Sequence, residues 1–489
     1  MRAGPVTRTG LVTGLRRHWL IASLVGVGAL IRILVMAAYA PAFWYYGDSG
    51  QYVTIATHLS DLHRYRPLGY PVLLAALWPT GSLAVVAAVQ HLAGVAVAVA
   101  IYVLLVRRGL PRVAASLAAV PMLLDSLQVD LEHFILSETL FTVLLFAGVV
   151  ALLWREQPSP LACAVAGLLL AAAWFTRPIA LCAVVLLAGY LALRRVGVRR
   201  FATFAAAFAV PWAGVVLWAG DTPSPYGSGA TGMFLYGRTA IVADCGRLQL
   251  ADELRPLCPT TPIDPVDAGR ADWYIWVYLP AEYRDDPRQD GLLREFAVEV
   301  IKQQPGDYLA VVAHESAPFF LPWIHLGRGH DFVSLKLTLP AAVGDHPGYP
   351  YLAGPGMSEL PADPAAAPPA TGLTRALHWY GVYVRTPGLF NTAVLLATLV
   401  ALVLAARRRA KDTTCWRDAR DAGALVTVGV ALLVAHVALS MYEPRYGAPA
   451  LPLFSLAAAL AWASLRAARP AAGVAGAQPP VPSSSSDNR

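Results

Sequence analysis

The feature that most constrains the fold of this chain is a series of uninterrupted apolar segments, each about 18–22 residues long. A helix of that length spans roughly 30 Å of hydrocarbon. Composition agrees, since 57% of the 489 residues are hydrophobic, 14% are charged and the mean hydropathy is +0.52. The segments lie near residues 19–40, 82–106, 111–126, 135–154, 160–176, 178–193, 201–219, 388–406, 421–441 and 447–466. We therefore predict an all-α polytopic membrane protein with about ten transmembrane helices.

The net charge of +7 is explained by where the basic residues lie, and it does not indicate nucleic-acid binding. More than half of the 38 Lys and Arg residues precede the first segment or follow every second one. Their main clusters are at residues 2–17, 107–112, 194–200, 407–420 and 466–489. The positive-inside rule then predicts a plasma-membrane protein with both termini cytoplasmic and the loop after the first segment outside. That segment lacks a small-residue cleavage site before Pro41, so we expect an uncleaved anchor.

The hydrophilic segments divide the chain into four predicted regions. These are an N-terminal transmembrane core (1–219, with its first outer loop at 41–81), an external loop subdomain (220–387), C-terminal transmembrane helices (388–466) and a disordered cytoplasmic tail (467–489). Helical spacing of apolar residues over 50–62, and again after the prolines of 66–78, predicts two juxtamembrane helices in the first outer loop. Residues 340–372 are rich in Pro, Gly and Ala, which predicts an irregular segment.

The external loop has helical signals of its own. Over residues 291–304, Leu293, Phe296, Val300 and Ile301 share one helical face, and Pro305 then stands at a helix start. The aromatic residues Phe319, Phe320 and Trp323 are typical of a membrane interface.

Two of the five cysteines lie in this external loop. Cys245 and Cys258 would form a disulfide in an oxidising compartment, and closing that loop would contribute about 3 kcal/mol in the chain-entropy model. The alternative is two free thiols. Cys163, Cys182 and Cys415 fall in spans or on the cytoplasmic side, where we expect them to be inert.

Charged residues gather at the outer ends of the spans. Polar groups are costly inside a membrane, so this lip is where a site is expected. A carboxylate there can take a proton from an acceptor hydroxyl, while guanidinium groups bind a phosphate and stabilise its charge as it leaves. The combination suits group transfer from a lipid phosphate. The residues are Asp48, Arg66, Asp125, Asp130, Glu132, His133, Glu138, Arg177, Glu443 and Arg445.

Several of these residues have a structural alternative. Asp48 precedes an amphipathic run and could cap its helix. Arg66 and Arg177 could be interfacial anchors that reach lipid headgroups. Glu443 and Arg445 could simply pair with each other.

Two further polar residues have structural interpretations, and other chemistry is poorly supported. His133 has the alternative of a packed interfacial histidine, and Arg32, inside the first span, needs a partner that the sequence does not name. The sequence has no Walker loop, no GxGxxG after a strand and no His/Cys cluster with zinc spacing. A nucleotide sugar is therefore not the expected direct donor.

The motifs resemble one family of membrane enzymes. They are GDSGQY after the first span, RPLGYP in the same loop, LEHFILSETLF at the fourth span, TRP before the sixth and YEPRY before the last. Their order resembles the glycosyltransferase-C superfamily, in its polyprenyl-phosphate-sugar-dependent branch with the protein O-mannosyltransferases and lipid A aminoarabinose transferases. The resemblance implies an inverting glycosyltransferase that moves a sugar from a polyprenyl-phosphate donor to a cell-envelope acceptor, whether glycan, lipid or protein, at the outer membrane face.

The resemblance also implies roles for residues. Asp48 matches the catalytic base and Arg66 the donor-phosphate ligand, with Arg177 and Arg445 expected beside it; Glu132 or Asp130 matches a second-loop acid that assists. Supporting roles are expected for Glu138, His133, Glu443 and Tyr70. Ser49 stands where relatives carry a second acid, which weakens the case for a bound Mg or Mn ion and leaves Asp48 as its candidate ligand.

Two other functions fit a polytopic chain with charges near the membrane. A transporter or lipid flippase is the first, but transporters more often show internal repeats and charges at the membrane midplane. We find no repeat, and the charges lie at the outer lip. A non-catalytic scaffold for envelope assembly is the second. The expected partners in the preferred interpretation are a polyprenyl-linked sugar, an envelope acceptor and the bilayer, without nucleic acid.

Overall fold

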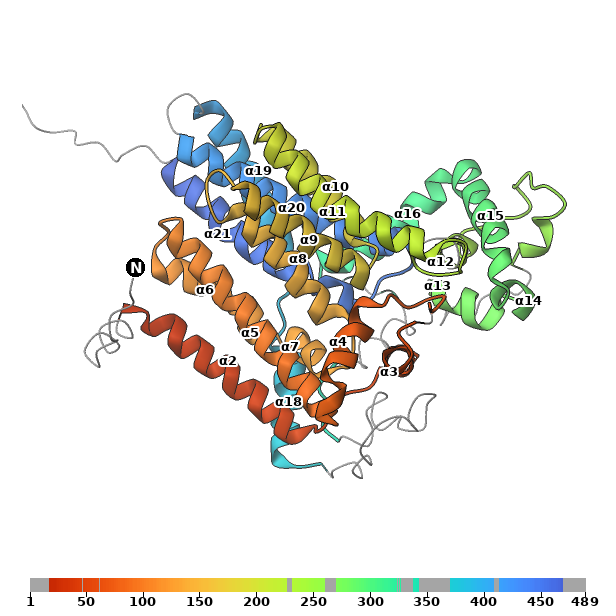
Figure 1. Ribbon diagram of the computed structural model, residues 1–489, viewed down its shortest axis with the longest axis horizontal. Helices are drawn as coiled ribbons and strands as arrows, with labels where there is room; N and C mark the ends of the chain where they lie inside the picture. Colours follow the sequence, from red (N-terminus) through yellow and green to blue (C-terminus); the bar gives the residue numbers. More distant parts are fainter. Residues whose placement is uncertain are drawn as a thin grey trace, which may run out of the picture.

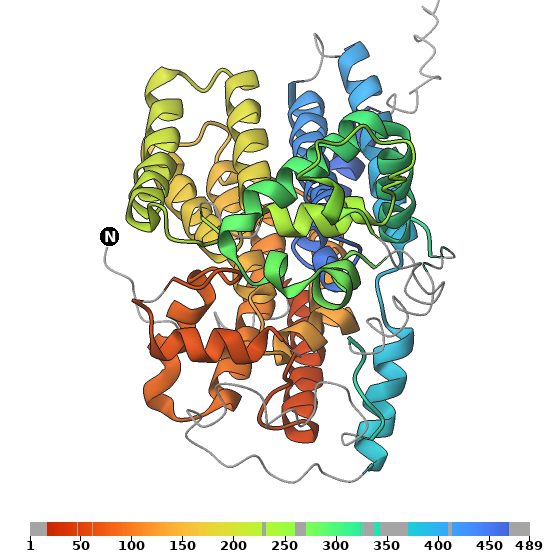
Figure 2. The same ribbon diagram turned by 90° about the vertical axis from the view of Figure 1, so that its right-hand side faces the viewer.

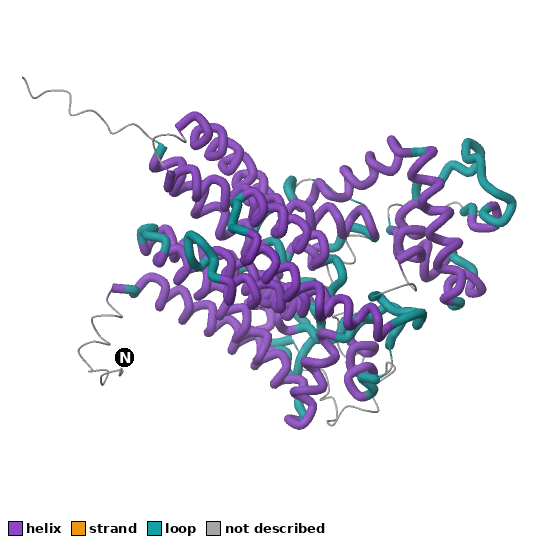
Figure 3. The backbone as a smooth tube through the Cα atoms, turned by 45° about the horizontal axis from the view of Figure 1, so that its top comes forward, coloured by secondary structure: helices purple, strands orange, loops and turns teal. Residues whose placement is uncertain are grey.

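The computed structural model describes most of the chain as helices. The described residues are 17–45, 47–60, 62–226, 231–259, 270–322, 324, 326, 337–342, 370–408 and 413–468. Within them there is no β-strand, and the single bridge joins Phe43 to Phe134 (Figure 3). Some predicted features lie outside these residues, namely Trp323, most of residues 340–372, the tail after residue 468 and the arginines before residue 17.

Five helical segments are long and apolar enough to cross a membrane. They are α2 (Trp19–Ala38), α5 (Leu83–Arg107), α11 (Val198–Ala219), the run Gly372–Arg407 that holds α18 (Gly372–Tyr383) and most of α19 (Gly388–Arg408), and α20 (Thr413–Leu439). Four shorter apolar helices accompany them: α8 (Glu138–Leu153), α9 (Pro160–Thr176), α10 (Ala180–Leu193) and α21 (Leu451–Ala467). The chain is thus a polytopic, all-α membrane protein.

The third predicted span is a helix pair bent by 49°, α6 (Arg112–Leu124) and α7 (Ser126–His133). Asp125 causes the break, because its backbone is extended and its side chain accepts a hydrogen bond from the Gln128 N–H, which caps α7. All ten predicted apolar segments therefore contain a helix, and this one turns sharply near its end.

The long helices run between the same two ends of the bundle. At one end Gln90 of α5 donates to the carbonyls of Glu132 and Phe134, while at the other end Tyr102 of the same helix contacts His18. Both ends of the described chain, near His18 and Ala467, lie at this second end, on the left of the bundle in Figure 1. We call the end nearest Asp48 the site end, and the other the opposite end.

The first outer loop forms the two predicted short helices at the site end. They are α3 (Ser49–Thr57) and α4 (Gly69–Leu77), followed by the 3-10 turn η1 (Trp78–Thr80). Tyr52 and Ile55 of α3 are buried, and the Tyr52 ring packs edge-on against Tyr70 of α4. Gly69 lies against Thr176, where a Cβ would clash at 2.4 Å, so α4 is held tightly to the end of α9.

The external region projects beyond the site end of the bundle (Figures 1 and 2). Its helices are α12 (Thr231–Ala240), α13 (Ala271–Trp273), a π-helical turn (Tyr274–Tyr278), α14 (Ala281–Arg284), α15 (Asp290–Gln303) and α16 (Pro305–Ser316); its 3-10 turns are Arg255–Leu257, Pro287–Gln289 and Ala317–Phe319. Leu293, Phe296 and Val300 are buried on the predicted face of α15, and Ile301 is half-buried. Pro305 begins α16 as predicted.

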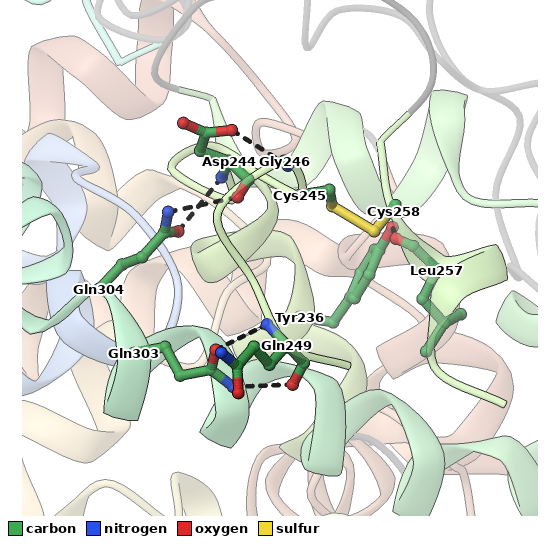
Figure 4. The surroundings of a disulfide bond; sticks show 9 residues. All are labelled: Tyr236, Asp244, Cys245, Gly246, Gln249, Leu257, Cys258, Gln303 and Gln304. Atoms are coloured by element: carbon green, nitrogen blue, oxygen red, sulfur yellow. Dashed lines mark hydrogen bonds between the residues drawn. A yellow bond between two sulfur atoms is a disulfide. The ribbon is translucent and has the colours of Figure 1, made fainter. Parts of the chain in front are cut away.

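Two covalent or ionic links stabilise this region. Cys245 and Cys258 form a disulfide, beside which the Tyr236 hydroxyl donates to the Leu257 carbonyl (Figure 4). Arg238 forms two hydrogen bonds, of 2.7 and 2.8 Å, with Glu315 inside the region. Glu315 also accepts from the Tyr442 N–H at 3.0 Å, which fixes the start of the 3-10 turn Pro444–Gly447 between α20 and α21.

Candidate active site

Asp48 stands at the start of α3 but does not cap it. It occupies the N-cap position, yet its side chain forms no capping hydrogen bond. Gly47 before it has a φ of +81°, a left-handed conformation that glycine adopts without strain. The Asp48 carboxylate is therefore turned away from α3 and is available for other partners.

Two arginines from distant parts of the chain hold this carboxylate. Arg66 reaches Asp48 Oδ1 at 2.5 Å and Arg445 reaches Oδ2 at 2.7 Å. The Asp48 side chain is only 11% exposed. Arg66 also donates to Gln51 at 2.8 Å, and the Arg445 guanidinium lies 4.4 Å from the centre of the Tyr45 ring. Arg66 is thus held by two side chains of its own loop, those of Asp48 and Gln51.

A second carboxylate joins the cluster from the start of α8. Glu138 Oε1 lies 2.5 Å from Arg177 and 3.4 Å from Arg445. Arg177 and Arg445 both lie 5.3 Å from the centre of the Tyr446 ring. Arg177 thus belongs to the same cluster as Asp48, although about 130 residues separate them in the sequence.

Glu443 completes the set, which we call the Asp48 cluster: Asp48, Arg66, Glu138, Arg177, Glu443 and Arg445. Glu443 pairs with Arg445, as the sequence alternative suggested, and accepts from the Tyr45 hydroxyl at 3.2 Å. Arg445 nevertheless extends further, to Asp48. The external region contributes Arg270, whose charge interacts with that of Glu443 while it pairs with Asp272.

The Asp48 cluster contains three carboxylates and three guanidinium groups, so its charges balance. Burial raises the pKa of Asp48, but the charges of Arg66 and Arg445 outweigh burial and hold that pKa below its ordinary value of 3.8. Burial lowers the pKa of Arg445, yet Glu443 and Asp48 raise it well above the usual range. Asp48 is therefore a carboxylate, and Arg445 a cation, at neutral pH.

One acceptor atom and one pocket in this area remain for a ligand. Glu138 Oε2 is buried and has no hydrogen-bond partner among the described residues. A pocket of about 200 Å³ lies against the Pro444–Gly447 turn, which carries Arg445; its lining also includes Asp125, Gln128, Arg385, Asn391 and Tyr442. Glu138 Oε2 is thus a buried acceptor in the Asp48 cluster that no described residue occupies.

Glu132 and His133 belong to a separate buried network. The Glu132 carboxylate accepts hydrogen bonds of 2.7 and 3.0 Å from Arg32, and it lies 3.0 Å from His91 Nδ1. His91 Nε2 lies 3.3 Å from His133 Nδ1, and His133 Nε2 contacts the Tyr39 carbonyl, where this series of hydrogen bonds ends. This network supplies the partner that Arg32 requires inside α2. The structure brings neither Glu132 nor His133 into contact with the Asp48 cluster.

Asp130 and Tyr70 also lie apart from Asp48. Asp130 is 1% exposed and neither of its carboxylate oxygens has a hydrogen-bond partner among the described residues. Tyr70 is fully buried and donates to Gln90 at 3.0 Å while it packs against Tyr52. The geometry gives Tyr70 a packing role behind α3.

The Asp48 cluster does not fit a divalent cation. Both Asp48 oxygens are occupied by arginines, and Glu138 and Glu443 are each paired with a guanidinium. No group of three His, Cys, Asp or Glu among the described residues is arranged to hold a metal ion. Positive charge at this site comes from arginine, so we assign no step to a Mg or Mn ion.

Aromatic residues are the part of the site that charge patterns missed. Tyr45 and Tyr446 flank the Arg445 guanidinium, and Tyr52 donates or accepts at Ser137 beside Glu138. Tyr45 lies two residues before the GDSGQY motif and Tyr446 ends the YEPRY motif, but charge alone singles out neither tyrosine in the sequence.

Comparison with solved structures gives two groups of similar proteins. The Archaeoglobus fulgidus oligosaccharyltransferase, solved with a tethered acceptor peptide, aligns over 92% of this chain with 14% identity and a TM-score of 0.41. The same enzyme, AglB, has also been solved with an inhibitory peptide and a dolichol-phosphate (15% identity, 92% of this chain, 50% of that one, TM-score 0.40). This chain covers 50% of the length of that enzyme.

The second group is ArnT from Cupriavidus metallidurans, solved with undecaprenyl phosphate. It aligns over 94% of this chain and 78% of its own, with 12% identity and a TM-score of 0.34. Both enzymes belong to the glycosyltransferase-C superfamily, which the motifs of this chain resemble. No family model and no curated protein matches the sequence. Likeness at this level says nothing about substrates, so function has to be argued from the site.

Proposed function

We propose that this protein is an inverting glycosyltransferase that moves a sugar from a polyprenyl-phosphate donor to a hydroxyl of a cell-envelope acceptor. The observation that supports this most is the position of Asp48, a buried carboxylate held between Arg66 and Arg445 at one end of a bundle of apolar helices. In this proposal Asp48 is the base and the arginines bind the donor phosphate, so the two groups would be in direct contact.

Donor binding would change the state of the base. The phosphate competes with Asp48 and Glu138 for the guanidinium groups of Arg66, Arg177 and Arg445, because phosphate oxygens accept the same N–H donors. As the arginines turn towards the phosphate, their positive charges lower the pKa of Asp48 less, and burial raises that pKa. Asp48 becomes a stronger base when the donor is bound.

The transfer step follows from this arrangement. The acceptor oxygen attacks the anomeric carbon on the face opposite the phosphate, its proton passes to Asp48, and the bond from the anomeric carbon to the phosphate oxygen breaks. The polyprenyl phosphate leaves with the bonding electrons, and the arginines stabilise its added charge. Glu138 Oε2 can accept from a substrate hydroxyl, and the 200 Å³ pocket at the Pro444–Gly447 turn offers polar groups for the acceptor.

Asp48→Asn tests the proposal. In membranes supplied with radiolabelled polyprenyl-phosphate sugars, loss of the base is expected to lower transfer by about 10²–10⁴-fold. Asn keeps the size of the side chain, and size-exclusion chromatography checks that the variant is folded. Asp252→Asn is the matched control, because Asp252 is fully exposed in the external region. Equal transfer by folded Asp48→Asn and parent protein would sink the assignment of Asp48 as base.

The donor class has a test of its own. Native mass spectrometry of the purified protein should detect a co-purified polyprenyl lipid phosphate, with less of it in Arg66→Gln. A transporter would also bind such a lipid, but it would not form the labelled product. Product formation that depends on Asp48 therefore separates an enzyme from a flippase.

A further inference from the structure

A second cluster of arginines lines a pocket far from Asp48. The pocket has a volume of about 440 Å³, and its lining includes Arg107, Arg108, Trp154, Arg155, Glu156 and Arg417. We call it the arginine pocket. Arg107 and Arg108 end α5, Trp154 to Glu156 follow α8, and Arg417 lies in the first turns of α20. Four arginines from three segments therefore line one pocket, whose volume is in the range of ligand sites.

The arginine pocket lies at the opposite end of the bundle from Asp48. Glu138, in the Asp48 cluster, begins α8 and Leu153, at the pocket, ends it; at 1.5 Å per residue these residues are about 22 Å apart along the helix. α20 gives the same order, with Arg417 at its start and the carbonyl of Ser440, which accepts from Arg238, just after its end. A ligand in this pocket would lie at the other membrane surface and could not contact the transfer site.

Buried acids hold the floor of the pocket in place. Asp418 lies 3.1 Å from Arg417 and 3.5 Å from Arg108, and Asp421 pairs with Arg108 and accepts from the Tyr190 hydroxyl at 2.6 Å. These contacts hold Arg108 and Arg417 in place without neutralising the charge of all the arginines at the pocket. Beside the pocket, Arg194 donates to the backbone carbonyl of Glu156 and Arg420 pairs with Asp421, so this group holds six arginines and three acids, Glu156, Asp418 and Asp421.

The rim of the pocket carries the charge that is not paired. Arg107 donates to the Trp154 carbonyl at 3.1 Å and lies 5.0 Å from the centre of the Trp154 ring, so its guanidinium is oriented by contacts that leave its charge in place. Neither Arg107 nor Arg155 forms an ion pair with an acid in the described part of the chain. Trp154, at the end of an apolar helix, is typical of the level of lipid headgroups.

We propose that the arginine pocket binds the phosphate of an anionic phospholipid in the leaflet opposite the transfer site. Guanidinium groups pair with phosphate oxygens through parallel N–H donors, and basic pockets between membrane helices suit anionic headgroups. Arg107 and Arg155 contact the phosphate, while Arg108 and Arg417 form the floor beneath it. The proposal does not depend on sugar transfer, because the two sites lie at different ends of the bundle.

Lipid titration of the purified, delipidated protein tests this site. Native mass spectrometry follows the binding of phosphatidylglycerol, phosphatidylcholine or inorganic phosphate to the parent, to Arg107→Gln/Arg155→Gln and to the control Arg199→Gln. Arg199 is exposed at the same end of the bundle and does not line the pocket. Each arginine near an anionic surface contributes roughly a fivefold change in affinity, so the double variant should bind phosphatidylglycerol about 25-fold more weakly.

The outcomes separate the occupants. Weaker phosphatidylglycerol binding in the double variant, with no change in Arg199→Gln or in phosphatidylcholine binding, supports the proposal. Unchanged phosphatidylglycerol binding overturns it. If millimolar inorganic phosphate displaces the lipid from the parent, and the double variant no longer binds phosphate, the lipid proposal is wrong and the pocket binds a free anion. If the double variant unfolds on heating earlier than the parent, Arg155→Gln alone, at an exposed position without a described partner, should still weaken binding roughly fivefold.

Discussion

At the scale of single residues, the chemistry of Asp48 depends on the two arginines that hold it. Burial alone would raise its pKa, and the charges of Arg66 and Arg445 bring it below 3.8. A depressed carboxylate pKa stabilises the folded protein at neutral pH, and that contribution is lost only as the pH falls through the folded-state pKa. The base form of Asp48 is therefore present throughout the neutral range.

Arg445→Gln should move the acid limb of activity to higher pH. The substitution removes one of the charges that lower the pKa of Asp48 and leaves burial less opposed, so the base becomes protonated at a higher pH than in the parent. The pH profile of kcat/KM for sugar transfer measures this shift. Arg445 also contacts the donor phosphate in our proposal, so the maximal kcat/KM falls as well. Only the interaction with Asp48 shifts the pH at which the acid limb falls. An acid limb at the parent's pH, whatever its height, would contradict the coupling.

The sequence identified the residues of the Asp48 cluster but only one of their pairings, that of Glu443 with Arg445. Charge at the end of an apolar span is visible in sequence, which is why Asp48, Arg66, Arg177 and Arg445 stood out. Which side of a helix each charge occupies is not visible. Glu132 follows the same pattern, yet it pairs with Arg32 of α2 instead of joining Asp48.

At the scale of helices, α5 and α7 are joined where a glycine meets a buried carboxylate. A Cβ at Gly94 would lie 1.8 Å from Glu132 Oε1, so only glycine permits the approach that lets Arg32 and His91 reach Glu132. The role that this geometry gives Glu132 is to tie α7 to α2 and α5. That role positions the Phe43–Phe134 backbone contacts next to the Asp48 loop.

Gly94→Ala should therefore destabilise the bundle. Displacing Glu132 leaves the buried Arg32 without its partner, and breaking a buried pair in this way costs roughly 3–5 kcal/mol. Thermal unfolding in detergent measures the loss. Gly26→Ala in α2 is the matched control, because a Cβ there meets nothing within 4 Å and the protein should unfold near the parent temperature. If both variants unfold at the parent temperature, the Glu132 network does not hold these helices together.

Hydropathy located the helices better than their ends and breaks. The apolar run at 111–126 is real, but its helix stops at Leu124 because Asp125 adopts an extended backbone and caps a new helix. The side-chain acceptor that favours this break is one aspartate within an apolar segment, and a sliding average over the segment does not detect it. Short α3 and α4 were predicted because prolines and helical spacing leave local signals.

At the scale of the whole molecule, the Asp48 cluster and the arginine pocket occupy opposite ends of one bundle. The described ends of the chain lie with the arginine pocket, and the disulfide lies with the external region beyond Asp48. We expect the arginine pocket to face the cytoplasm on two separate grounds, the positive-inside rule and the need of a disulfide for an oxidising compartment. We expect the transfer site to face outwards.

Cysteine labelling in intact cells tests this orientation. Glu282→Cys places a thiol on the exposed surface of α14 in the external region, and Gln157→Cys places one in the exposed loop beside the arginine pocket. A membrane-impermeant maleimide should label Glu282→Cys in intact cells and Gln157→Cys only after the cells are opened. Glu282 lies in the external region beyond the site end and Gln157 in the loop between α8 and α9 at the opposite end of the bundle, so the two thiols should be labelled from opposite sides of the membrane. Labelling of Gln157→Cys in intact cells, with Glu282→Cys protected, would reverse the topology and place the Asp48 cluster in the cytoplasm.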